Sequence, residues 1–190
     1  MKPLDEVPKQ AQARFLRALE RFLREMVLLR YQQTALKMLN GRYSVGADFF
    51  SIAQRGIYGD RLIRLVRLLE DDTDVASFWY LNRCAPCAVS DCLARSGCTL
   101  DEIADLSARV KGIRDRVFVH IDKKGLFNPE QIYRDANIEG SQIERVINGL
   151  WLSLNTLYET ATGNKFKKPP EYDGSDIVKL NEFYERGFQL

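Results

Sequence analysis

The stretch TLDEIADLSARVKGIRDRVFVHID, residues 99–122, decides the fold class. It opens with Thr99, followed three positions later by Glu102, which is the capping box that starts many α-helices. Apolar residues then recur every three or four positions along one helix face, at Ile103, Leu106, Val110, Ile113 and Val117. The stretch is followed by Lys123, Lys124 and Gly125, which suit a helix C-terminus. We therefore predict an amphipathic helix from residue 100 to about residue 122.

The same helical period continues on both sides of this stretch. It predicts further helices, one of them interrupted by Pro86, over residues 8–40, 45–70, 77–95, from 128 onward, 139–161 and 175–186. No stretch alternates apolar and polar residues between turn signals, as a half-buried strand would. We predict an all-α, antiparallel helical bundle over residues 1–162. A loop and a short helix at residues 163–190 are expected to pack on the same domain.

Composition limits the class of protein more loosely. Of the 190 residues, 45% are hydrophobic and 28% are charged, which is typical of a globular domain. The net charge of +2 neither requires nor excludes nucleic acid as a partner, because the distribution of charge matters more. No apolar run reaches membrane-spanning length, and the first residues lack the apolar core of a signal peptide. We expect a cytoplasmic protein with no membrane partner.

The sequence contains one histidine, His120, and it lies in the stretch quoted above. An imidazole titrates near neutral pH and can act as a general acid or base. Arg114, six positions earlier, offers a permanent positive charge for a phosphate in the transition state. Asp115 lies beside that arginine and is expected either to orient it or to hold the local backbone. These residue types suit RNA cleavage without a metal, and a single histidine excludes a metal site built from two histidines of one chain.

Helix geometry bears on how these groups meet. In an α-helix, positions six apart differ by about 120° in direction and about 9 Å in rise. Arg116 and His120, four positions apart, share a face, whereas Arg114 and His120 do not. We therefore expect a symmetric dimer that presents two copies of this helix to one cleft.

The arrangement Arg114-Asp115-x-x-x-x-His120 resembles the signature of the HEPN superfamily. The wider chain resembles its abortive-infection (AbiU-like) branch over roughly residues 10–160. The matching segments are Gly46-Ala47-Asp48-Phe49-Phe50, residues 58–63, residues 68–71 and residues 113–122. In one toxin subgroup a tyrosine stands two positions after the histidine and is modified by a partner enzyme. Asp122 stands at that place here, so this mode of control is not expected.

This resemblance implies an all-α bundle that forms a homodimer with a composite cleft. It implies a ribonuclease, acting as a toxin, that cleaves RNA without metal or cofactor and leaves a cyclic phosphate. Arg114, Asp115 and His120 would be its catalytic residues. The expected setting is phage defence or a toxin–antitoxin system, with an antitoxin or a defence protein as a further partner. The alternative is a non-catalytic HEPN domain that binds nucleotide, RNA or a partner protein.

Simpler interpretations stand beside these. His120 would suit a helix C-terminus as a cation, and Arg114 would suit a surface ion pair. Four cysteines, Cys84, Cys87, Cys92 and Cys98, favour small buried side chains at helix crossings over a zinc site or a redox pair. The arginines at 14, 17, 21, 24, 61, 64 and 67 favour a solvated face over a track for RNA phosphates. Gly56 and Gly59 predict a kink or a close helix crossing.

Overall fold

The computed structural model describes residues 2–39, 47–119 and 129–187. Within these ranges every regular element is helical and no strand is present, which confirms the predicted all-α bundle. The elements are α1 (Pro3–Glu6), α2 (Lys9–Leu39), α3 (Ala47–Leu69), α4 (Phe78–Cys84), α5 (Pro86–Ser96), α6 (Leu100–Ile113), the π-helical segment η1 (Arg114–Val119), α7 (Pro129–Ala136), α8 (Gly140–Thr162) and α9 (Ser175–Gly187). No helix in the described ranges is both long enough and apolar enough to cross a membrane.

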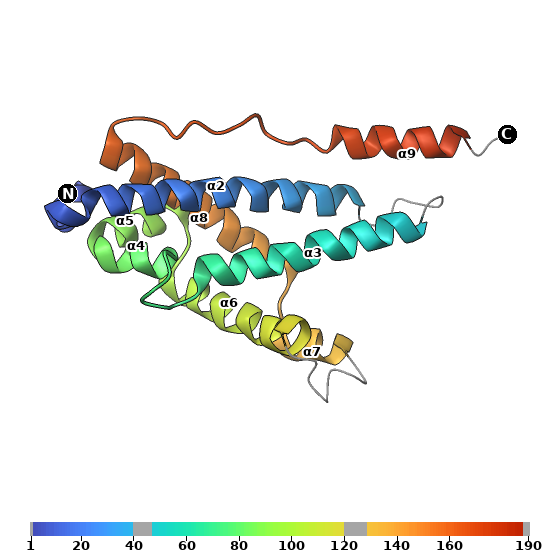
Figure 1. Ribbon diagram of the computed structural model, residues 1–190, viewed down its shortest axis with the longest axis horizontal. Helices are drawn as coiled ribbons and strands as arrows, with labels where there is room; N and C mark the ends of the chain where they lie inside the picture. Colours follow the sequence, from blue (N-terminus) through green and yellow to red (C-terminus); the bar gives the residue numbers. More distant parts are fainter. Residues whose placement is uncertain (1, 40–46, 120–128, 188–190) are drawn as a thin grey trace.

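The long helix α2 lies at the centre of the bundle, and α3 runs antiparallel beside it (Figure 1). One side of α2 is buried along most of its length, at Phe15, Leu19, Phe22, Leu23, Met26 and Leu29. Burial of each such side chain contributes about 1.5–3 kcal/mol of transfer free energy. α8 packs on α2 and on α5, while α6 packs on α3. Residues 163–174 return along α2 to α9, which begins beside the C-terminal end of α2 and extends past it (Figure 1).

The junction between α4 and α5 lies at Pro86, where the sequence predicts an interruption. Pro86 occupies the first turn of α5, where its missing N–H is not needed. The next two backbone N–H groups, of Cys87 and Ala88, both donate to the carboxylate of Glu6 at 2.8 Å. The short helix α1, which the sequence pattern does not predict, therefore supplies the cap for α5.

The start of α6 confirms the capping box. The N–H of Glu102 donates to Thr99 Oγ1 at 3.2 Å, and the N–H of Thr99 donates to Glu102 Oε2 at 3.0 Å. α6 ends at Ile113, and the chain continues as a π-helical segment to Val119, which the sequence does not predict. The predicted end of this helix near residue 122 lies outside the described residues. A π-helix forms i→i+5 hydrogen bonds, and an apolar spacing of three or four does not distinguish it from an α-helix.

Gly149, and not Gly56, marks a close approach of a helix to a neighbouring segment. A Cβ built on Gly56 would meet nothing within 4 Å, so the expected close crossing is absent there. A Cβ built on Gly149 of α8 would lie 2.6 Å from Cys98 Cβ, in the turn between α5 and α6. α8 therefore approaches the α5–α6 turn through a position that only glycine fits.

Candidate functional site

Arg114 is the first residue of the π-helical segment η1, directly after α6. π-helical turns are rare and are found disproportionately at functional sites. The segment carries both of the predicted site residues that the structure describes, Arg114 and Asp115. It continues α6 and packs on α3 and α7.

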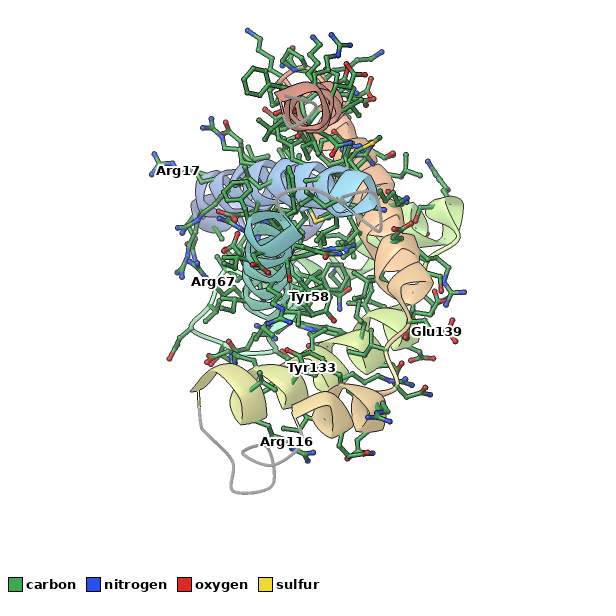
Figure 2. All side chains as sticks on the ribbon, turned by 90° about the vertical axis from the view of Figure 1, so that its right-hand side faces the viewer. Arg17, Tyr58, Arg67, Arg116, Tyr133 and Glu139 are labelled. Atoms are coloured by element: carbon green, nitrogen blue, oxygen red, sulfur yellow. The ribbon has the colours of Figure 1, made fainter. Side chains whose placement is uncertain are left out.

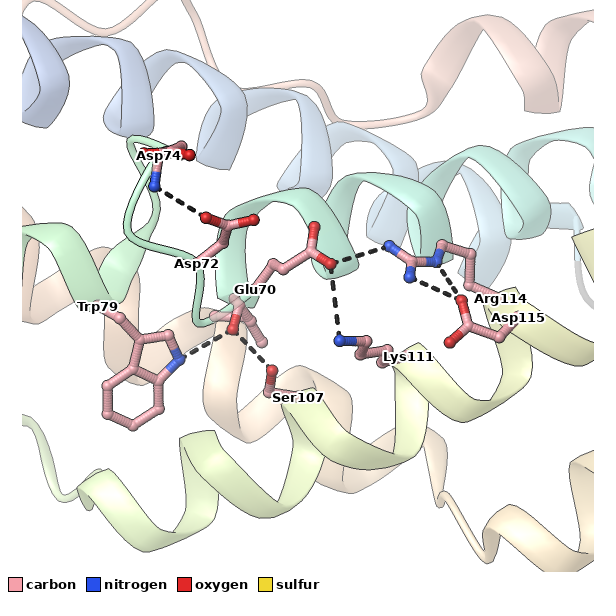
Figure 3. A network of polar contacts seen from close by, with 9 residues as sticks. Glu70, Asp72, Asp74, Trp79, Ser107, Lys111, Arg114 and Asp115 are labelled. Atoms are coloured by element: carbon pink, nitrogen blue, oxygen red, sulfur yellow. Dashed lines mark hydrogen bonds and ion pairs between the residues drawn. The ribbon is translucent and has the colours of Figure 1, made fainter. Parts of the chain in front are cut away.

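Asp115 holds the guanidinium of Arg114, as the sequence predicts. Arg114 Nε and Nη2 lie 2.7 Å and 2.6 Å from Asp115 Oδ1. A second carboxylate, which the sequence analysis missed, lies on the other side: Arg114 Nη1 donates to Glu70 Oε1 at 3.3 Å. Both Arg114 and Glu70 keep 23% of their side-chain surface exposed, so the pair is half-buried but reachable from solvent. Figure 3 shows this network.

Lys111 of α6 adds a second cation to the same carboxylate, with its Nζ 3.9 Å from Glu70 Oε1. Burial acts to lower the pKa of Arg114, but its hydrogen bonds to Asp115 and Glu70 outweigh burial and raise the pKa above the usual value. The guanidinium is therefore charged at every physiological pH. Two cations and two carboxylates meet here, so their formal charges cancel. An anion would therefore bind Arg114 by displacing one of the carboxylates.

Glu70 is positioned by the C-terminal end of α3. The carbonyl oxygen of Leu69, the last residue of that helix, accepts hydrogen bonds from Trp79 Nε1 at 2.9 Å and from Ser107 Oγ at 2.6 Å. These two donors come from α4 and α6, so three helices meet at this oxygen (Figure 3). Glu70 follows immediately and reaches Arg114, which is 44 positions away in sequence.

His120 lies outside the described residues. The structure therefore brings together Arg114 and Asp115 of the three predicted catalytic residues, and it adds Glu70 and Lys111. In the sequence, Glu70 is only a carboxylate that directly follows α3. Its role becomes visible once α3 is known to pack on α6, because Arg114 directly follows α6.

A groove of about 480 Å³ opens beside this cluster, between α2 and the C-terminal half of α3. We call it the Glu70 groove; its walls carry Arg21, Glu25, Arg64, Arg67 and Glu70. Arg64 is held by Glu25 at 2.6 Å and by Asp60 at 2.7 Å. Arg21 and Arg67 form no ion pair with any described residue and are exposed. Arg67 projects from the same side of the molecule as Arg17 (Figure 2).

Arg61 departs from the predicted solvated face, because only 5% of its surface is exposed. Its Nε and Nη2 atoms are buried without a hydrogen-bond partner among the described residues. Burial lowers the pKa of Arg61, while Glu144 and Tyr58 act in the opposite direction. The Tyr58 ring points towards Tyr133 of α7, with ring centroids 6.1 Å apart (Figure 2). Burying a cation of this kind costs free energy of desolvation. Arg61 is therefore an interior residue and not part of the exposed arginine face that the sequence predicts.

The cysteines are all free thiols, and two of them, Cys92 and Cys98, are buried in the core. Cys98 fills the space opposite Gly149, as a small residue at a helix crossing does. Cys87 is exposed, and its pKa is raised chiefly by the charge of Glu6. Within the described ranges, no group of three or more His, Cys, Asp or Glu side chains is placed to hold a metal ion.

Comparison with protein-family models, with curated proteins and with solved structures found no match for this chain.

Proposed function

We propose that this chain is a metal-independent endoribonuclease of the HEPN type, in which Arg114 binds the scissile phosphate. The observation that supports the proposal is the half-buried guanidinium of Arg114, held in place by Asp115 and by Glu70. Glu70 itself lines a groove with arginine side chains. Carboxylates and phosphates bind guanidinium in the same bidentate manner. A phosphate that replaces Glu70 would therefore meet Arg114, with Lys111 close by.

The reaction follows from the groups available. A base removes the proton of a ribose 2′-OH, and the 2′-oxygen attacks the adjacent phosphorus. The bond from phosphorus to the 5′-oxygen breaks, and an acid returns a proton to that oxygen, which leaves a 2′,3′-cyclic phosphate. His120 is assigned one of these proton transfers, and His120 of a second copy is assigned the other. Arg114 stabilises the additional negative charge on the phosphate.

Activity of this kind fits a homodimer in the cytoplasm, as a toxin in phage defence or with an antitoxin. The role of Asp115 is to orient Arg114, through the two contacts to its Oδ1 atom.

The test is cleavage of a labelled RNA in the presence of EDTA. We expect His120→Ala to reduce the rate about 10²–10⁴-fold and Arg114→Ala about 10²–10³-fold. Arg186→Ala, at an exposed arginine of α9, is the matched control and should cleave at the wild-type rate. Cleavage that survives both active-site changes, or that EDTA abolishes, would rule out the mechanism.

The second candidate is a non-catalytic HEPN domain that binds RNA or a partner protein. The observation that favours it is that both sides of Arg114 are already occupied by carboxylates of the same chain. A wild-type dimer that binds RNA and leaves it uncut under varied salt and pH would support this function over cleavage.

A further inference from the structure

A second groove lies on the other side of α2, under the segment that connects α8 to α9. It has a volume of about 1000 Å³, which is at the upper end of the range for ligand sites. We call it the loop groove; one wall is formed by α2 and the other by residues 164–169. It shares no lining residue with the Glu70 groove.

The floor of the loop groove is apolar and aromatic. Leu28 of α2 is 42% exposed there, although it is a large aliphatic residue. The ring of Phe166 is held in position by edge contacts with Trp151 and Tyr158, at centroid distances of 6.3 Å and 5.7 Å. Tyr31 is fixed as well, since its hydroxyl donates to the carbonyl of Pro170. These rigid flat groups suit a flat, partly apolar ligand.

The rim of the loop groove is positively charged. Lys165 and Lys167 are exposed on either side of Phe166, and neither forms an ion pair with any described residue. Lys168 and Arg24 also reach the rim but are paired, with Glu171 and Glu20 respectively. Two free ammonium groups above an aromatic floor favour a ligand that carries both negative charge and flat rings.

Exposed cations continue across α2 towards the Glu70 groove. Arg17, Arg21, Arg24 and Leu28 follow one another at intervals of four, three and four residues, so they form one exposed stripe of the helix. Arg24 lines the loop groove and Arg21 lines the Glu70 groove. The two grooves are therefore neighbours across a single helix, and the stripe between them is basic.

We infer that the loop groove binds unpaired nucleotides of a single-stranded RNA. The bases would lie on Leu28, Tyr31 and Phe166, and the phosphates would contact Lys165 and Lys167. Single strands are bound by this combination of cations and aromatic side chains, because unstacked bases expose flat faces that a duplex hides. The inference extends the proposed ribonuclease function, since the same strand would continue over Arg24 and Arg21 to Arg114. Binding at the groove does not depend on cleavage.

The experiment measures binding of a fluorescently labelled oligouridylate of twelve nucleotides, and of its deoxy counterpart, by fluorescence anisotropy at several salt concentrations. The deoxy strand lacks the 2′-OH and cannot be cleaved, so binding is measured whether or not the ribonuclease proposal holds. We expect K165E/K167E to weaken binding about tenfold or more and to reduce the salt slope by about 1.4, the value for two lost phosphate contacts on a single strand. Leu28→Ser should weaken binding with the slope unchanged.

Matched controls exclude a general effect of charge or folding. The variant K9E/K179E alters two exposed lysines outside both grooves. Each Lys→Glu exchange removes two units of charge, so both double variants go from +2 to −2. Leu152→Ser alters an aliphatic residue that is 56% exposed on α8. Both controls should bind as the wild type does.

Several results would overturn the inference. One is that K165E/K167E and K9E/K179E weaken binding equally. Others are that a duplex binds as tightly as the single strand, or that an acidic peptide binds more tightly than the oligonucleotide. The last is that neither strand binds. Binding that depends on Lys165 and Lys167 without any RNA cleavage would uphold the groove and refute the ribonuclease.

Discussion

Gly149 of α8 faces Cys98 so closely that a Cβ added to the glycine would lie 2.6 Å from the Cβ of the cysteine. A Cβ is fixed to the backbone, so neither atom can turn away and a helix must shift. We predict that Gly149→Ala lowers the free energy of unfolding by about 1–3 kcal/mol, as over-packing of a core does. Urea denaturation followed by circular dichroism measures this.

Gly56→Ala is the matched control, because Gly56 is also helical and has open space around it. We expect it to raise stability by about 0.4–1 kcal/mol by reducing the freedom of the unfolded chain. The variant G149A/C98G should be less destabilised than the sum of its single changes. If Gly149→Ala were as stable as the wild type, α8 would not approach Cys98 as described.

Cys98 provides a second prediction, in which stability depends on pH. Burial raises the pKa of this thiol from 9.0 to about 11, and its surface is 2% exposed. Between these values the unfolded chain releases the proton while the folded chain keeps it. Unfolding therefore becomes easier as pH rises from 9 to 11, by at most about 1.4 kcal/mol per pH unit.

The measurement compares the wild type with Cys98→Ala, which keeps the Cβ and removes the titrating group. Stability of the wild type should fall more steeply than that of the variant from pH 9 to pH 11, and the two slopes should agree below pH 8. Parallel curves over the whole range would mean that the thiol titrates alike in the folded and unfolded chains.

Arg61 gives a third prediction, because it is a buried cation with two nitrogen atoms that lack a described partner. Methionine is unbranched, flexible and apolar and needs no hydrogen-bond partner, so Arg61→Met should leave stability unchanged or raise it by about 1–4 kcal/mol. Thermal unfolding monitored by calorimetry tests the direction.

Arg64→Met, one helical turn further along α3, is the comparison. Arg64 is paired with Glu25 and Asp60 at partly exposed positions, so this change should lower stability by about 0–1 kcal/mol. A loss of several kcal/mol in Arg61→Met would instead indicate that the guanidinium is satisfied in the folded protein.

The fourth prediction concerns Glu70, whose carboxylate pairs with Arg114. In the proposed function, a phosphate displaces this carboxylate. Glu70→Gln removes the competing charge but keeps the shape of the side chain. Binding of the uncleavable deoxy strand should become about two- to tenfold tighter, because one fewer carboxylate must be displaced. The same anisotropy assay measures it.

Glu182→Gln removes a carboxylate that pairs with Arg186 on α9, away from both grooves, and should leave binding unchanged. Weaker binding in Glu70→Gln would show that Glu70 holds Arg114 in its binding geometry and does not compete with the ligand.

The helices themselves could be predicted from the sequence because their signals are local. The capping box at Thr99, the proline at position 86 and the spacing of apolar residues lie within a few positions of the features they determine. The predicted bounds of α2, α3, α8 and α9 agree with the structure to within a few residues. These elements need no knowledge of distant contacts.

The rest depends on contacts between distant segments. The contact of Glu70 with Arg114 and the approach of Gly149 to Cys98 arise only once helices pack. Arg61 shares its three-residue spacing with Arg64 and Arg67, and its burial is set by α3's neighbours, which the spacing does not reveal. The π-helical segment after Ile113 carries apolar residues at intervals that an α-helix would also allow.

The carbonyl oxygen of Leu69 couples the orientation of α6 to the end of α3. If α6 turned about its own axis, Ser107 would leave that oxygen and Arg114 would move relative to Glu70 in the same step. The indole of Trp79 would then be the only one of the two donors left to hold the end of α3. A rotation of α6 would thus change the Ser107 and Arg114 contacts together. A partner that rotates this helix would therefore change the position of the Arg114 guanidinium without contacting it.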